Sequence, residues 1–167
     1  ANRCEPAEVT ELTNELARFG PKSYVLPEEP FLGAPSVGDL LRAVRGTLIK
    51  GDETLLAREA LGVLAAGMTA EHVLERLQEG IAVITPGDRS DVVLAVMSAH
   101  AAEGFPSLST VILNGGLPLH PSIAALVDGL KLRLPIIATD LGTYETARAA
   151  PTARAASGAP ICAASAW

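Results

Sequence analysis

The spacing of apolar and polar residues predicts a regular alternation of strands and helices from Ser36 onward. Short apolar runs bounded by turn residues are typical of buried strands, and apolar residues spaced three or four apart are typical of helices. The strands are predicted at residues 46–52, 59–68, 81–85, 109–116 and 134–140, and the helices at 36–44, 69–80, 88–104, 120–132 and 143–150. Repeated strand–helix pairs predict an α/β fold, a three-layer α/β/α arrangement with a mostly parallel sheet.

Residues that begin and end helices support these boundaries. Ser36 with Asp39 three positions later is close to a capping box. Thr69 and Asp88 are suited to N-cap positions, and Pro121 to a first helical turn. We therefore expect Asp88 to cap the helix that starts beside it.

The first 35 residues have a different character. Residues 6–19 carry apolar residues at helical spacing, and four prolines follow within residues 21–35. We predict a helical arm with an extended connector over 1–35, an α/β domain over 36–149, and an Ala/Ser/Pro-rich tail over 150–167.

Composition excludes several functional classes. The chain has 13 basic and 19 acidic residues and a net charge of −6, without the basic stripe that a nucleic-acid backbone requires. No apolar stretch has the ~20 residues of a membrane span, and Cys4 and Cys162 form no disulfide or zinc pattern. We expect no nucleic-acid partner, no membrane association, no metal, no cofactor, and a reduced, cytoplasmic location.

Three loops follow the strands and hold the candidate ligand-binding residues. Ligands of parallel α/β sheets collect at the carboxyl ends of strands, where "ITPGDRSD" (84–91), "ILNGG" (112–116) and "IATDLGTYET" (137–146) are expected to converge. The residues proposed to line this crevice are Asp88, Arg89, Asn114, Gly115, Gly116, Thr139 and Thr143, with Asp140 and Thr146 beside them.

A purely structural role explains part of this set. Asp88 as an N-cap and Asp91 in the first turn both suit the positive end of a helix dipole. Arg89 does not suit that position, and an ion pair, a subunit contact and an anionic effector all remain open for it. His72, His100 and His120 have no metal-ligand spacing and are interpreted as helix-surface residues, and no catalytic motif is present.

The stretch "ITPGDRSDVV" resembles the signature of the DRTGG domain, the middle, regulatory segment of long bacterial phosphate acetyltransferases. Asp88 and Arg89 match the name motif, whereas Ser90, Asp91 and Val92 replace its Thr-Gly-Gly in the form similar to that of the long acetyltransferases. "LPEEPFLGAPSVGDL" resembles the connector that follows a P-loop domain related to dethiobiotin synthetase, and "ANRCEP" the end of that domain. "TYETA" resembles the segment before the catalytic domain.

The resemblance implies a non-catalytic regulatory and oligomerisation module, whose parent moves acetyl between coenzyme A and phosphate. It implies as partners the rest of the parent polypeptide and a small metabolite effector, such as a nicotinamide nucleotide or pyruvate. No catalytic residue is carried over. Two alternatives remain: a stand-alone small-molecule or nucleotide sensor, and a small-molecule enzyme acting in the crevice.

The apolar residues of 88–104 point to assembly. A surface helix normally keeps a polar stripe, and residues 92–99 are apolar on nearly every side. We therefore expect a homo-oligomer with this helix, or the one at 121–130, near the contact. The alternative is that the domain's own sheet covers the helix completely.

Overall fold

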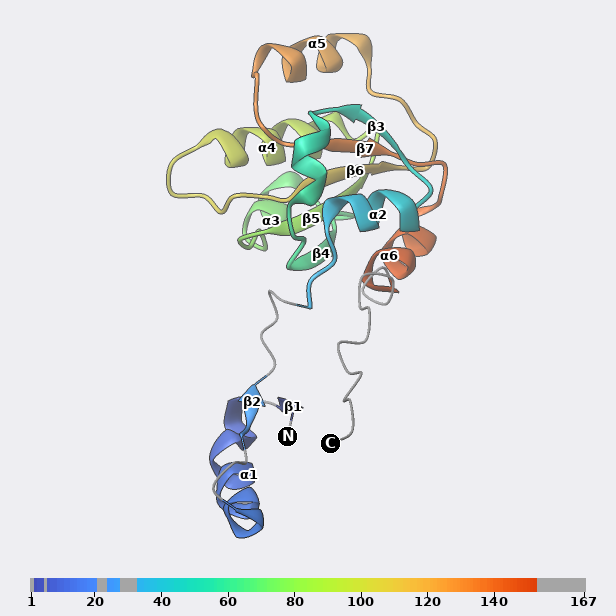
Figure 1. Cartoon of the computed structure of the whole chain (residues 1–167). Helices are drawn as coiled ribbons and strands as arrows, with labels where there is room; N and C mark the ends of the chain where they lie inside the picture. Colours follow the sequence, from blue (N-terminus) through green and yellow to red (C-terminus); the bar gives the residue numbers. More distant parts are fainter. Residues whose placement is uncertain (1, 5, 21–23, 28–32, 153–167) are drawn as a thin grey trace. The chain divides into compact units, whose positions relative to one another are not determined.

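The computed structural model describes residues 2–4, 6–20, 24–27 and 33–152. The chain divides into two compact units, Ala1–Gly33 and Ala34–Trp167 (Figure 1). The predicted tail beyond residue 152 and most of the proline-rich connector lie outside the described residues.

The first unit is a small strand–helix–strand segment. β1 (Asn2–Cys4) pairs in parallel with β2 (Leu26–Pro27). Between them, η1 (Pro6–Glu8), α1 (Val9–Leu16) and η2 (Ala17–Phe19) form the predicted helical stretch, and no residue of α1 is buried. A two-stranded sheet of this kind has too little core to be stable alone.

The second unit is built on a five-stranded sheet. Its strands are β3 (Thr47–Lys50), β4 (Gly62–Ala65), β5 (Ile81–Pro86), β6 (Thr110–Asn114) and β7 (Ile136–Ala138), in the order β3-β7-β6-β5-β4. β4 to β7 are parallel, and β3 is an antiparallel edge. The predicted α/β class and mostly parallel sheet are confirmed.

Helices cover both faces of this sheet. α3 (Ala70–Leu74), α4 (Ser90–Ala101) and α5 (Pro121–Gly129) lie on one face, and α2 (Val37–Ala43) and α6 (Thr143–Thr152) on the other, with η3 (Glu53–Ala57) beside α2 (Figure 1). Alternate residues of β5 divide between two apolar cores: Ile81 and Val83 face α3 and α4, and Ala82 and Ile84 face α2 and α6. The three-layer arrangement follows from this alternation.

The capping box at the start of α2 is present, because Asp39 N donates to Ser36 Oγ at 3.1 Å and Ser36 N donates to Asp39 Oδ2 at 2.9 Å. These bonds to Ser36, helped by Arg42, hold the pKa of Asp39 below its ordinary value. The reciprocal bonds explain why the sequence predicted this helix start correctly.

Two other helix starts differ from the prediction. α4 begins at Ser90 with Arg89 at the N-cap, so the prediction that Asp88 caps it is wrong. Pro86, Gly87 and Asp88 instead form a turn, in which Arg89 N donates to the Pro86 carbonyl at 3.1 Å. Thr69 does occupy the N-cap of α3, but its side chain makes no cap bond, and the helix ends at Leu74 rather than near Gly80.

Candidate functional site

The loops that follow β6 and β7 are joined by their backbones. Gly115 N donates to the Leu141 carbonyl at 2.8 Å, and Gly116 N donates to the Thr139 carbonyl at 3.0 Å. Both glycines have positive φ, 82° and 65°, a conformation that other residues rarely adopt. The chain leaves β6 toward α5 and β7 toward α6, on opposite faces of the sheet, and these bonds close the gap between them.

The loop after β5 joins the same assembly at Gly87. A Cβ atom at this position would lie only 1.8 Å from the Leu117 carbonyl oxygen. The two backbones therefore pack directly against each other, and the glycine is required by space rather than by its φ. The three strand-end loops converge, as the sequence indicated.

Asn114 is the polar centre of this assembly. Its side chain is buried and lies 2.8 Å from the Thr143 hydroxyl. With its amide oxygen toward α6, it accepts from Thr143 N at 2.9 Å and donates to the Thr85 carbonyl at 3.0 Å. Asn114 thus links the end of β5 to the first turn of α6.

Thr139 has a similar internal role. It is buried, donates from Oγ1 to the Val44 carbonyl at 2.7 Å, and accepts from Leu141 N at 3.2 Å. Thr146, also buried, bonds back to the Gly142 carbonyl at 2.8 Å. The polar side chains that the sequence proposed as ligand contacts are brought together, but they bond to the protein itself.

Arg89 is turned away from these residues. Its Nε and Nη2 each donate to a carboxylate oxygen of Asp91 at 2.9 Å, and Nη2 also donates to the Met68 carbonyl at 2.9 Å. The Asp91 hydrogen bond raises the pKa of Arg89, and the same bond lowers the pKa of Asp91. Met68 lies in the loop after β4, on the side of β5 opposite β6. Of the three explanations for Arg89, the structure supports the ion pair.

Asp88 is exposed and lies beside a shallow groove. The groove has a volume of about 590 Å³ and runs between the starts of α4 and α5; its lining residues are Asp88, Ser90, Pro118, Leu119, His120, Pro121 and Ile123. His120 caps α5, because Ser122 N donates to its Nδ1 at 3.3 Å. The sequence indicated only Pro121 at this helix start and missed the cap.

His100 is also not a plain surface residue. It is partly buried at the end of α4, and its Nδ1 accepts from Leu108 N at 3.0 Å. Nothing in the local spacing indicated this, since the partner is a backbone N–H in the following loop. Across the described ranges, no three His, Cys, Asp or Glu side chains are placed to hold a metal ion. No helix in the described part of the chain has the length and apolarity to cross a membrane.

The model of the DRTGG domain family matches residues 39–153. The chain belongs to the DRTGG domain family. The predicted resemblance to this family is confirmed. The matched range contains α3 to α6 and all three strand-end loops of this DRTGG domain.

Similar proteins carry this domain within much longer chains. The sequence is 31% identical over 150 residues to a phosphate acetyltransferase of Synechocystis, covering 87% of this chain and 21% of that protein. It is 32% identical over 124 residues to a phosphate acetyltransferase of Nitratidesulfovibrio vulgaris, covering 74% and 18%. The DRTGG domain chain therefore spans about a fifth of the length of these relatives.

A solved structure shares the fold. The regulatory region of a Clostridium perfringens pyrophosphatase, with CBS and DRTGG domains and the activator diadenosine tetraphosphate, superposes with a TM-score of 0.58. The match covers 74% of this chain and 49% of that one at 20% identity. This likeness concerns the fold alone.

Proposed function

We propose that this DRTGG domain is a non-catalytic regulatory and assembly module of a phosphate acetyltransferase. The observation that carries the proposal is that the polar side chains at the strand ends form hydrogen bonds within the protein. In a catalytic crevice, polar groups are aimed at a substrate, whereas Asn114 and Thr143 bond to each other and Thr139 bonds to the Val44 carbonyl. The similarity to phosphate acetyltransferases, of which the chain spans about a fifth, supports a role within such an enzyme.

The catalytic alternative is tested by assaying the purified chain for acetyl phosphate formation from acetyl-CoA and phosphate. We expect no turnover above a buffer control, because acyl transfer requires groups that this chain does not bring together at its strand ends. Turnover that follows the protein through purification, and that is lost in Asn114→Ala, would favour the enzyme in the crevice instead.

The proposed effector is a small metabolite of nucleotide type. The DRTGG-containing neighbour is an activator-bound regulatory region, and this chain keeps an open groove beside Asp88. Pro118, Leu119 and Ile123 offer an apolar surface for a base, and the Asp88 carboxylate can accept from ribose hydroxyls, as acidic residues do in dinucleotide sites. Exposed Gly115 and Gly116 leave the adjoining backbone open to the same ligand.

Calorimetric titration with ATP, NADH and diadenosine tetraphosphate tests this effector. We expect binding of at least one of them, weakened roughly tenfold in Asp88→Asn, because hydrogen bonds to a charged group contribute about 1.5–3 kcal/mol. Glu103→Gln removes an exposed carboxylate after α4 and is the matched control. No heat with any of the three, or equal weakening in both variants, would remove the nucleotide from the proposal.

Assembly is proposed through α5. Leu126 on the helix is 56% exposed, Leu130 at its C-cap is 42% exposed, and Leu117 before the helix is 43% exposed. The charge of Asp128 on this helix is paired with Lys50 at 3.0 Å, beside an Nζ bond to the Val127 carbonyl. An uncharged, apolar helix face is suited to packing against a second copy.

The first unit is proposed to be the end of a preceding P-loop-type domain. A parallel strand pair joined by a helix is a fragment of a larger sheet, and the half-buried residues Val9, Leu12 and Leu16 of α1 form an apolar stripe that such a sheet would cover. Removing residues 1–33 is expected to leave one cooperative unfolding transition for the rest. Loss of that transition in circular dichroism would contradict the division.

A further inference from the structure

Arg58 is an unusual cation within the α/β unit. Arg42, Lys50, Arg76 and Arg89 each lie within 4 Å of a carboxylate. The remaining described cations between residues 34 and 150 are exposed, apart from Arg58: they are Arg45, Lys131, Arg133 and Arg148. Arg58 is partly buried, and no carboxylate oxygen of the described residues lies within ion-pair distance of it.

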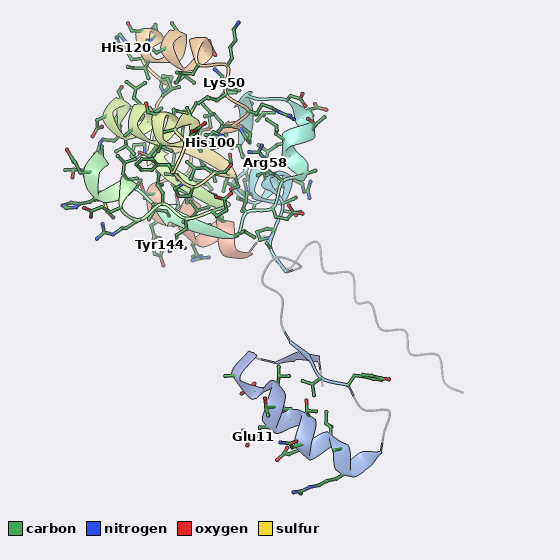
Figure 2. The ribbon with its side chains drawn as sticks, turned by 90° about the vertical axis from the view of Figure 1, so that its left-hand side faces the viewer. Glu11, Lys50, Arg58, His100, His120 and Tyr144 are labelled. Carbon is green, nitrogen blue, oxygen red and sulfur yellow. The ribbon has the colours of Figure 1, made fainter. Side chains whose placement is uncertain are left out.

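His100 shares a contact with Arg58. Arg58 Nη1 donates to the Leu108 carbonyl at 3.3 Å, and Leu108 N donates to His100 Nδ1 at 3.0 Å. One loop residue therefore holds the two side chains, which come from the end of η3 and from α4 (Figure 2). Arg58 precedes β4 and His100 precedes β6, so both lie at the end of the sheet opposite the strand-end loops.

Several hydrogen-bond donors at this place have no described acceptor. Because His100 Nδ1 accepts, the proton of the neutral ring is on Nε2. Arg58 has five N–H groups, of which the bond to Leu108 uses one. Ser109, the next residue of the loop, is 1% exposed and its hydroxyl has no partner among the described residues. The nearby Glu79 carboxylate accepts from Ser107 N at 2.7 Å through one of its two oxygens.

We propose that Arg58 and His100 form a binding site for a small oxyanion, the phosphate or carboxylate group of a metabolite. An oxyanion presents several acceptor oxygens, and a planar guanidinium donates to two of them at once. The His100 Nε2–H supplies a further donor. This site is separate from the groove beside Asp88 and stands or fails independently of the proposed function.

The charges at the site make its occupation measurable. Burial lowers the pKa of His100 first, the Arg58 charge lowers it further, and the Glu79 carboxylate opposes them. An anion bound to Arg58 neutralises that charge and favours protonated His100. Occupation therefore raises the pH at which His100 titrates, and the anion binds more tightly as the pH falls.

The test is a proton NMR titration of His100 in the full chain against pH, at constant ionic strength. It is run with chloride alone, with millimolar inorganic phosphate, and with millimolar acetate. His100→Gln assigns the resonance. Arg58→Gln removes the charge, Arg58→Lys keeps the charge without the fork, and Arg133→Gln removes an exposed cation as the matched control.

We expect phosphate, acetate or both to raise the midpoint of the His100 titration in the wild type and in Arg133→Gln. The anion that acts identifies the phosphoryl or the carboxylate source. The response should be absent in Arg58→Gln and need roughly tenfold more anion in Arg58→Lys, since bidentate bonding is lost. If the proton spectrum of Arg58→Gln loses its dispersion, that variant is unfolded. The response of Arg58→Lys alone then tests the site. No response in the wild type, an undiminished response in either Arg58 variant, or equal loss in Arg133→Gln overturns the site.

Discussion

α4 and α5 are both rich in apolar residues but differ in their surroundings. Both are apolar on almost every side, yet α4 buries Val92, Val93, Val96, Met97 and Ala99, whereas α5 buries only Val127. α4 lies between α3 and α5 on the sheet, and α5 is the outer member of the row (Figure 1). The same pattern therefore indicates core in one helix and an exposed apolar face in the other.

The difference teaches that the position of a helix in its layer decides what its apolar residues do. A helix in the middle of a row has neighbours on both sides, and a helix at its end has one. The end helix keeps an apolar face only where another surface covers it, because large exposed apolar patches are rare on monomeric proteins. This is the physical basis for proposing that α5 takes part in assembly.

The largest expected effect is on α4. Met97→Ala should lower the free energy of unfolding by about 2–5 kcal/mol, because it leaves a cavity in a closed core. Leu126→Ala on α5 is the comparison and, at concentrations at which the chain is a monomer, should change it by less than about 0.5 kcal/mol, as most exposed sites do. Urea unfolding of both variants measures the contrast, and equal losses would mean that α5 is as enclosed as α4.

A smaller effect is expected where the loops leading into the two helices meet. Gly87→Ala places a methyl group against the Leu117 carbonyl, and overpacking of this kind costs roughly 1–3 kcal/mol. Gly67→Ala is the matched control, since Gly67, like Gly87, has no positive φ, and no atom lies within 4 Å of its added Cβ. Amide exchange should increase at the starts of both α4 and α5 in Gly87→Ala. An increase confined to one helix would show that their loops are not coupled.

A pH effect is expected at the end of α4. The folded-state pKa of His100 is lowered by burial and by Arg58, so the unfolded chain, with a pKa of about 6.5, binds the proton more readily. Stability is therefore lost as the pH falls below about 6.5 and levels off below the folded-state pKa. Urea unfolding at several pH values should give a smaller decline for His100→Gln. Identical pH profiles would mean that His100 titrates alike in both states.

Much of the fold was predictable because it depends on local patterns. Strand-length apolar runs placed all five strands of the sheet, and the reciprocal bonds of Ser36 and Asp39 made one helix start certain. The start of α4 was not predictable, because Asp88 is as good a cap as Ser36 by composition. The Pro86–Gly87 turn moved the helix by two residues.

The sequence predicted where the candidate site lies, but not which groups its side chains contact. Parallel topology brought Asn114, Thr139 and Thr143 together, as expected. That they bond to Thr85, Val44 and each other depends on distances that no spacing rule encodes. The Arg58–His100 pair was missed for the same reason, since both residues bond to the backbone of Leu108 and not to a side chain with a recognisable motif.

The comparison is tested most directly by sedimentation velocity of the wild-type chain and of Leu126→Asp across a micromolar concentration series. The account predicts a dimer or larger species for the wild type and a folded monomer for Leu126→Asp, with an unchanged circular dichroism spectrum because Leu126 is exposed within one copy. A wild-type chain that is monomeric throughout the series would contradict the assembly role of α5.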